Sequence, residues 1–181
     1  MKLLNNSAVK NEKPEFFVGF DPGVIKGCIT VLDSKRSVVN ELKIYRDDIH
    51  FLVGVLRQIK HTIAGSLDST VVLAEMQSMR PGQGLSSNSK LLNNYTFTCG
   101  YFVGLGVPLF VCQATEWQQS FGLGGKQGPE NCSASVEYRY RKAAHKRTAE
   151  KIFQTQLEDW QADARLIARY LQNFTLGLFE V

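Results

Sequence analysis

The stretch FFVGFDPGVIKGCITVLD, residues 16–33, decides the fold of this chain of 181 residues. Residues 16–20 are apolar or small, as is typical of a buried strand, and the run leads directly into Asp21. Asp-Pro-Gly is favourable turn chemistry and residues 27–33 have the composition of a second strand, so the stretch predicts a hairpin. Asp21 is therefore either a turn residue alone or a carboxylate whose partners lie elsewhere in the chain.

The composition is that of a soluble globular protein, with 44% hydrophobic and 21% charged residues and a net charge of +4. We expect a polar N-terminal arm over residues 1–15 and a single domain over residues 16–175. No signal peptide or membrane span is expected, which favours an intracellular protein of a bacterial cytoplasm, a phage-infected cell or an organelle. The four cysteines form no CxxC pair and are expected to be free thiols rather than a zinc site.

Hydrophobic periodicity predicts five strands and five helices. The strands are expected at residues 16–20, 27–33, 38–45, 71–76 and 108–113. The helices are expected at residues 48–63, 87–105, 114–121, 136–155 and 158–174. Three antiparallel strands followed by alternating helices and strands predict an α/β fold, a mixed five-stranded sheet flanked by helices. The functional site is then expected at the carboxyl ends of the parallel strands.

Two further carboxylates occur where apolar residues are expected. Glu75 interrupts the strand-like run VVLAEM, and a lone buried carboxylate costs several kcal/mol unless it is paired or bound to a metal. A salt bridge with Arg80 or a nearby lysine is one explanation. Asp163 falls on the apolar stripe of the last helix, with Asp159 one turn before it, so that both can share a face. Alternatively, these two residues are a helix N-cap and a first-turn dipole partner.

Asp21, Glu75 and Asp163 would repel each other if they were packed together, and divalent cations would remove that repulsion. Magnesium prefers carboxylates, water and phosphate oxygens, and two ions about 4 Å apart are the usual arrangement for phosphodiester hydrolysis. The pattern therefore predicts a site for two Mg²⁺ ions, with Mn²⁺ as a substitute and no nucleotide cofactor.

Five segments resemble, in order, the RuvC family of Holliday junction resolvases in the ribonuclease H-like superfamily. They are VGFDPGVIKGCITVLD, VVLAEMQSMRPGQGLSS, YFVGLGVPLFVCQATEWQQSFGL, AHKRTAEKIF and QADARLIARYL. The resemblance implies a ribonuclease H-like fold, a homodimer, and paired magnesium-dependent nicks in a branched, four-way DNA junction. It assigns metal-binding, catalytic roles to Asp21, Glu75 and Asp163. Relatives carry "HGRAD" or "DAAD" where this chain has DWQAD, and Asp159 is assigned to the fourth position.

Basic residues beside these segments are expected to contact DNA phosphates. The stretch YRYRKAAHKR forms a basic helical stripe, the loop after Glu75 adds further charge, and GLGGKQG is a second flexible candidate. The predicted DNA-binding residues are Arg80, Lys90, Lys126, Lys142, Lys146 and Arg147.

The leading interpretation is a structure-selective endonuclease that resolves four-way junctions by in-line hydrolysis, leaving 5′-phosphate and 3′-hydroxyl ends. An RNA-processing nuclease of the same fold, similar to the YqgF group, is an alternative. Actin-like phosphotransferases share the Asp-x-Gly hairpin, but they need a second domain for which this chain is too short. A non-catalytic junction-binding protein also remains open because of the altered DWQAD segment.

Overall fold

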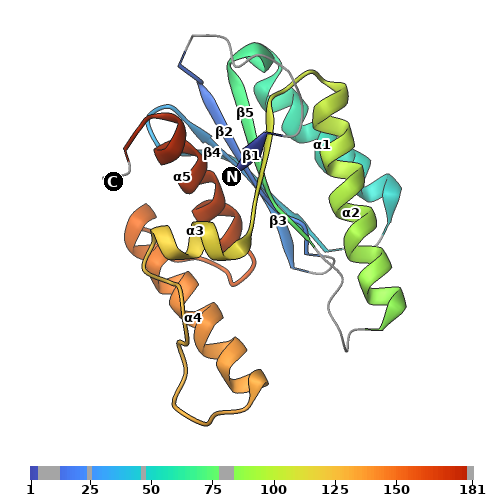
Figure 1. Ribbon diagram of the computed structural model, residues 1–181. Helices are drawn as coiled ribbons and strands as arrows, with labels where there is room; N and C mark the ends of the chain where they lie inside the picture. The colour runs from blue at the N-terminus through green and yellow to red at the C-terminus, as the bar shows by residue number, and fades with distance from the viewer. Residues whose placement is uncertain (4–12, 24–25, 46–47, 78–83, 179–181) are drawn as a thin grey trace.

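The computed structural model describes residues 1–3, 13–23, 26–45, 48–77 and 84–178, which form three layers (Figure 1). A mixed sheet lies between α1 and α2 on one face and α5, with α3 and α4 beside it, on the other. The strands are β1 (Lys2–Leu3), β2 (Phe16–Asp21), β3 (Gly27–Asp33), β4 (Val38–Ile44), β5 (Thr70–Glu75) and β6 (Leu109–Cys112). The helices are α1 (Ile49–Ile63), α2 (Leu85–Gly104), α3 (Ala114–Ser120), α4 (Ala134–Phe153) and α5 (Ala162–Thr175), with a 3₁₀ turn at Leu67–Ser69.

The sheet has the order β1-β6-β5-β2-β3-β4. Strand β2 pairs antiparallel with β3 and parallel with β5, and β5 pairs parallel with β6, which confirms the predicted mixed sheet flanked by helices. The predicted count of five strands is wrong, because β1 adds a sixth strand, antiparallel to β6, at the edge of the sheet. Two residues are too few to show the alternation by which a strand is recognised in a sequence.

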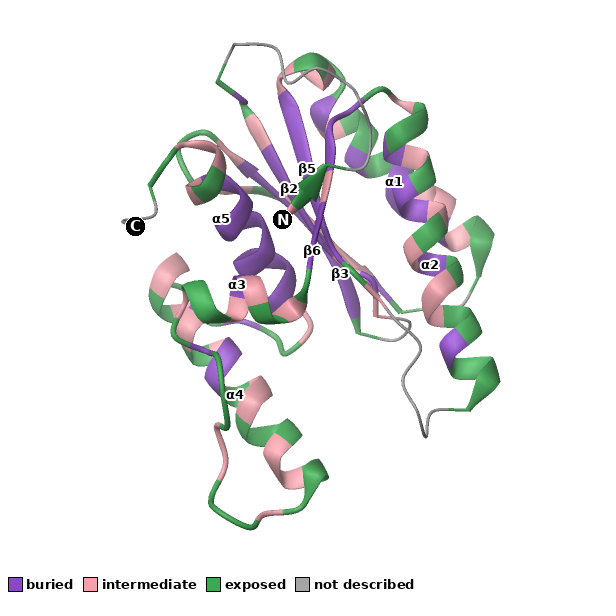
Figure 2. Cartoon of the chain, viewed as in Figure 1, coloured by how far each residue is buried: buried purple, intermediate pink, exposed green. Residues whose placement is uncertain are grey.

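The central strands β2, β3 and β5 are buried on both faces because helices cover the centre of the sheet, whereas the edge strands β1 and β4 are partly exposed (Figure 2). Along β2, Val18 and Phe20 pack into the core beneath α1 and α2, whereas Phe17 packs into the core beneath α5. Cys28, Cys99 and Cys112 are buried free thiols and Cys132 is partly buried and free, as predicted. Among the described residues, no helix combines the length and the apolar character needed to cross a membrane.

Helix α5 lies against β2 at a distance that only glycine permits. A Cβ atom on Gly19 would lie 2.3 Å from the carbonyl oxygen of Ala164 and 2.8 Å from Cβ of Ala168. Because this contact fixes the helix against the strand that ends in Asp21, it brings the first turn of α5 close to the end of β2.

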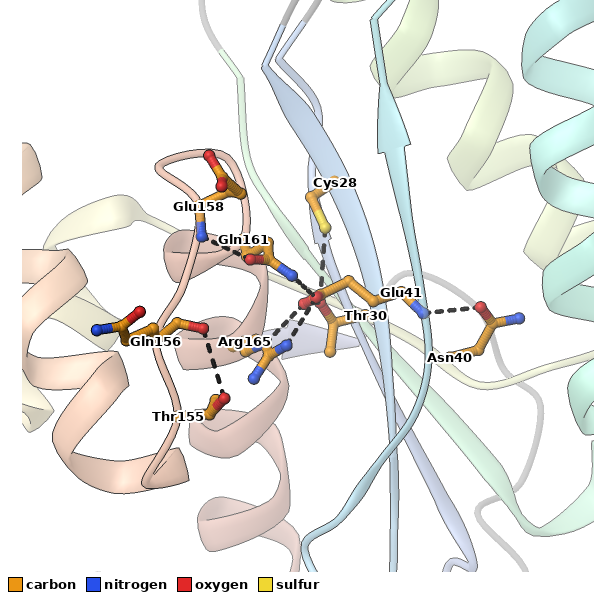
Figure 3. A network of polar contacts seen from close by, with 9 residues as sticks. All are labelled: Cys28, Thr30, Asn40, Glu41, Thr155, Gln156, Glu158, Gln161 and Arg165. Carbon is orange, nitrogen blue, oxygen red and sulfur yellow. Dashed lines mark hydrogen bonds and ion pairs between the residues drawn. The ribbon is translucent and has the colours of Figure 1, made fainter.

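A buried polar network fixes the rotation of α5 (Figure 3). Glu41 of β4 accepts hydrogen bonds from Nε and Nη2 of Arg165, both at 2.8 Å, and from Oγ1 of Thr30, also at 2.8 Å. The side-chain amide of Gln161 donates to the same carboxylate. The buried carboxylate of Glu41 and the guanidinium of Arg165 are thus fully paired. Such a buried ion pair contributes little net stability, and its main effect is to specify one orientation of the helix. That orientation turns Asp163 toward the strand ends.

Candidate active site

Three acidic side chains meet where β2 and β5 end. Asp21 closes β2 and Glu75 closes β5, and these two strands run in parallel with Phe20 opposite Ala74, so their carboxyl ends share one edge of the sheet. Asp163 lies in the first turn of α5. The three carboxylates line one pocket of about 360 Å³. The structure therefore brings together Asp21, Glu75 and Asp163 of the predicted set.

Asp163 is held by two residues of α4. The ammonium group of Lys142 donates to Oδ2, and Nδ1 of His145 lies 2.9 Å from Oδ1. Burial opposes ionisation, but the hydrogen bond from His145 and the charge of Lys142 together lower the pKa of Asp163 to about 2. Since an ionised carboxylate can only accept, Nδ1 of His145 carries the proton and donates.

Glu75 is held by two neutral donors. Nε1 of Trp117 donates to Oε2 at 2.9 Å, and the side-chain amide of Gln77 donates to Oε1 at 3.2 Å. Burial and the charge of Asp163 raise the pKa of Glu75 above its ordinary value, although both hydrogen bonds act against this rise. Glu75 is thus oriented without a salt bridge to any described residue.

Trp117 and His145 link the two held carboxylates to each other. Their rings meet edge to face, with centroids 5.2 Å apart and planes at 70°, and both side chains are almost fully buried. Nε2 of His145 has no hydrogen-bond partner among the described residues, while its ring also lines the pocket. The two packed rings therefore lie between Glu75 and Asp163. Trp117 donates a hydrogen bond to Glu75, and His145 donates one to Asp163.

Asp21 carries the least compensated charge of the three acids. Burial raises its pKa to about 7, Lys142 acts in the opposite direction, and the charges of Asp163 and Glu75 raise it further. Three carboxylates therefore share the pocket with three cationic side chains, Lys26, Arg141 and Lys142, and Lys142 is the one that pairs with Asp163. The pKa of Lys142 is raised by Asp163 and Asp21, although burial opposes its charge. Asp21 itself forms no ion pair with a described residue, and its pKa stays raised.

The carboxylate oxygens of this pocket are the type of ligand that a divalent cation such as magnesium prefers. Magnesium is usually held by one or two carboxylates, with water and substrate phosphate oxygens completing its shell, and Asp21 and Glu75 are two such ligands. Within the part of the chain that the structure describes, no three His, Cys, Asp or Glu side chains are close enough to enclose an ion by themselves. An ion at this site would therefore rely on water or substrate oxygens as well as protein ligands.

Asp159 does not join the other acids. The expected shared helical face is wrong, because α5 begins at Ala162 and Asp159 lies in the turn before it. Its side chain is 69% exposed, and its carboxylate lies 3.4 Å from Nζ of Lys146. It lines a neighbouring pocket of about 320 Å³ that shares Lys142 with the acidic pocket.

The predicted DNA-binding residues are distributed unevenly. Lys142 lines both pockets and Lys146 lines the pocket of Asp159, whereas Arg147 and Lys126 are exposed outside the acidic pocket. Lys90 is exposed near the start of α2. Arg80 falls outside the described residues, so neither its predicted DNA contact nor its alternative pairing with Glu75 is tested.

Several residues that line the site were not predicted individually, although Tyr138 and Arg141 belong to the basic stretch that was predicted to contact phosphates. Lys26 and Tyr138 line both pockets, and Arg141 lines the acidic pocket. Trp117 and His145, which hold the carboxylates, were also missed. Tyr138 and Arg141 stand on the first half of α4, where no residue is buried before Ala144 and the helix projects away from the sheet (Figure 1). Only the basic and aromatic composition of this stretch signalled a binding surface.

The chain thus has a three-layer α/β fold, with acidic residues at the ends of two adjacent parallel strands and on the helix that crosses them. No family model and no curated protein sequence matches the chain. Among solved structures, Thermus thermophilus RuvC is similar at 14% identity and a TM-score of 0.52, covering 90% of this chain and 95% of that one. T. thermophilus RuvC in complex with a Holliday junction substrate gives 14% identity and a TM-score of 0.54, covering 90% and 94%.

The yeast mitochondrial Holliday junction resolvase Ydc2 also matches, at 13% identity and a TM-score of 0.45 over 94% of this chain and 83% of that one. The two RuvC matches cover almost the whole of both chains, so the chain has the ribonuclease H-like fold of RuvC. At this level of identity the likeness concerns the fold, and the chemistry is argued from the residues of this chain.

Proposed function

We propose that this chain is an endonuclease that cuts four-way DNA junctions by divalent-metal-dependent phosphodiester hydrolysis. The observation that carries the proposal is the convergence of Asp21, Glu75 and Asp163 in one pocket directly beneath the basic helix α4. Acidic ligands for a cation next to cationic contacts for phosphate are the combination that metal-dependent phosphodiester cleavage uses.

Asp21 and Glu75 are the residues proposed to hold the ion. A divalent cation, when bound, supplies Lewis-acid polarisation of the phosphodiester and neutralises the negative charge that the pocket concentrates. Trp117 keeps one oxygen of Glu75 occupied. This leaves Oε1, which among the described residues accepts a hydrogen bond from Gln77 alone, as the oxygen available for coordination. Second-shell donors of this kind commonly fix the orientation of ligating carboxylates.

Lys142 is proposed to have two roles. In the described state it pairs with Asp163 and lowers the cost of packing three acids together. Its position in the wall of both pockets also suits it to contact a DNA phosphate that enters beside Asp21. His145 holds the other oxygen of Asp163, so this carboxylate stays oriented if Lys142 turns toward the substrate.

The substrate and assembly are proposed from the fold together with α4. A RuvC of the same fold has been solved in complex with a Holliday junction substrate, and the projecting half of α4 here carries Arg139, Arg141 and Lys142 with Tyr138 among them. Such a stripe binds phosphates without reading sequence, as expected for a protein that selects a branched shape. Paired nicks in opposite strands would require a homodimer.

The test is incubation of the purified protein with a synthetic four-way junction, with and without Mg²⁺ or Mn²⁺. We expect symmetric nicks only when the ion is present. Asp21→Asn and Glu75→Gln should abolish nicking and keep junction affinity, while Glu130→Gln in an exposed loop controls for the loss of one charge. Linear duplex DNA and single-stranded RNA are the comparison substrates, and faster cleavage of the RNA would favour the RNA-processing alternative.

A non-catalytic junction-binding protein is the second candidate, and one observation favours it. Both oxygens of Asp163 are already engaged by Lys142 and His145, and Asp159 lies outside the pocket. Two of the four predicted ligands are therefore not available to an ion in the acidic pocket in this state. This candidate predicts junction binding of equal strength with and without the ion and no nicked product at any ion concentration.

A further inference from the structure

A second polar pocket, of about 570 Å³, lies further along α5, away from the acidic site. It is formed by the turn between β3 and β4, the end of α4, and one side of α5. Arg36, Arg165 and Arg169 line it together with the polar side chains of Ser37 and Thr155. Among its described lining residues none is acidic.

The charge of Arg165 is already compensated. Its guanidinium forms two hydrogen bonds of 2.8 Å with the buried carboxylate of Glu41, the pair at the centre of the network in Figure 3. Glu41 also accepts from Thr30 and Gln161, so it has no capacity left for a further arginine. Glu41 therefore does not neutralise the other two arginines of the pocket, Arg36 and Arg169.

Within the part of the chain that the structure describes, Arg169 is buried without an acidic partner. It is only 7% exposed, its Nη2 donates to the carbonyl oxygen of Arg36 at 3.3 Å, and its Nε has no hydrogen-bond partner among the described residues. Burial and the nearby charge of Arg36 lower the pKa of Arg169 to about 10. An unpaired buried cation beside a second cation is costly, and an anion in the pocket would relieve both costs.

Two features of the protein offset part of this cost. The guanidinium carbon of Arg169 lies 5.1 Å from the centroid of the Phe153 ring, and the last residues of α4, near the negative end of its dipole, also line the pocket. Neither supplies the pair of coplanar oxygen acceptors that a guanidinium group binds best. Arg36, which is exposed, makes no ion pair with a described residue.

We propose that this pocket binds a phosphate group. Arginine presents a rigid fork of donors that matches phosphate oxygens, and Arg36 and Arg169 can approach one group from two sides, with Ser37 and Thr155 adding hydroxyl donors at the rim. The group belongs either to the backbone of a DNA arm that extends beyond the acidic pocket or to a small phosphate compound. The chemistry of recognition is the same in both cases.

The first experiment measures binding of inorganic phosphate by calorimetry at constant ionic strength, using the full-length protein without divalent ions. We expect Arg36→Gln to weaken binding by about tenfold or more, because it removes charged hydrogen bonds from an exposed position without disturbing the fold. Arg57→Gln, an exposed arginine on α1, is the control for loss of one positive charge. Phosphate bound only along α4 would be equally insensitive to both substitutions.

The second experiment identifies the source of the phosphate. If a DNA arm supplies it, Arg36→Gln lowers junction affinity and reduces the slope of log affinity against log salt by about 0.9. If a small compound supplies it, phosphate binding weakens and junction affinity does not change. The proposal is overturned if wild-type protein takes up no phosphate, or if Arg36→Gln and Arg169→Met both bind it as wild type does. Neither assay requires cleavage, so failure here is distinct from failure of the proposed nuclease.

Discussion

Asp21→Asn should make the protein more stable while it abolishes cleavage. A pKa of about 7 in place of the ordinary 3.8 means that folding opposes ionisation of Asp21, at a cost of about 4 kcal/mol once it is fully ionised. Because Asp21 is only half-buried, solvent screening reduces this figure, and we expect about 2–3 kcal/mol. Asparagine keeps the shape and the acceptor oxygen but has no charge for Glu75 and Asp163 to repel.

The sign of the pH dependence follows from linkage. Since the pKa of Asp21 is higher in the folded state, that state binds more protons, and wild-type stability falls as the pH rises from about 4 to about 7. The Asp21→Asn variant has no carboxylate at this position, so it does not lose this stability as the pH rises. The stability difference between the two proteins should be small near pH 4, grow up to pH 7 and stay constant above it.

The assay is urea unfolding at pH 4.5 and pH 8 with EDTA present. Asp159→Asn is the matched control, because that side chain is exposed and its substitution should change stability by no more than about 0.5 kcal/mol. Adding Mg²⁺ at tenfold its Kd should then stabilise wild type by about 1.4 kcal/mol and Asp21→Asn by less. If Asp21→Asn were no more stable than wild type at pH 8 in EDTA, the crowding of charge argued for this pocket would be refuted.

Three further substitutions test the fold and the site. Gly19→Ala should lower the free energy of unfolding in urea by about 3 kcal/mol or more, because its Cβ would overlap α5. Gly100→Ala, in open space on α2, is the control and should be neutral or stabilising. Equal stability of the two variants would contradict the close packing. Trp117→Phe removes the hydrogen-bond donor to Glu75. It should raise the Mg²⁺ concentration for half-maximal cleavage by about 10- to 100-fold and leave junction affinity unchanged. An unaltered Mg²⁺ requirement would argue against the role of Trp117 in positioning Glu75. Asp159→Asn should keep cleavage within about threefold of wild type, and complete loss would restore Asp159 as a metal ligand.

The positions of Asp21 and Glu75 were predictable because their signal is local. An apolar run that ends in a carboxylate is visible in any short window, and so is a charge inside a strand of valines and leucines. The adjacency of β2 and β5 is not local, since a long crossover separates them in sequence. The place where each acid lies in its strand could be inferred from local residues. The meeting of the acids was inferred from the α/β pattern, which places functional residues at the carboxyl ends of parallel strands, and the family resemblance implied the same site.

The start of the last helix was mispredicted because tertiary contacts decide it. Asp159 is a good capping residue, so local propensity favours a start near it. Instead the backbone N–H of Glu158 donates to the side chain of Gln161 at 2.6 Å, and the amide of the same Gln161 donates to Glu41. These bonds form a turn before Ala162 and leave Asp159 in solvent, and no local pattern contains the position of Glu41.

Trp117 and His145 were missed for a related reason. A tryptophan on a short helix and a histidine on a basic helix are usually structural residues, and their sequence separation from Glu75 and Asp163 hides the contacts. A buried tryptophan generally finds a partner for its N–H, and the two acids expected at the site were available partners. That rule could have indicated Trp117, whereas the role of His145 emerges only from the packing of α4 on α5.

The charge of Asp21 supports the proposed catalytic role over passive binding. Lys142 and His145 engage both oxygens of Asp163, whereas burial and the neighbouring acids raise the pKa of Asp21 to about 7. A protein that only bound junctions would gain stability by replacing Asp21 with a neutral residue, and it would lose nothing in its contacts with phosphate. Active sites commonly retain such destabilising groups because the function depends on them. The free-energy cost of keeping Asp21 ionised therefore supports the proposed cation site over a pocket that only contacts DNA.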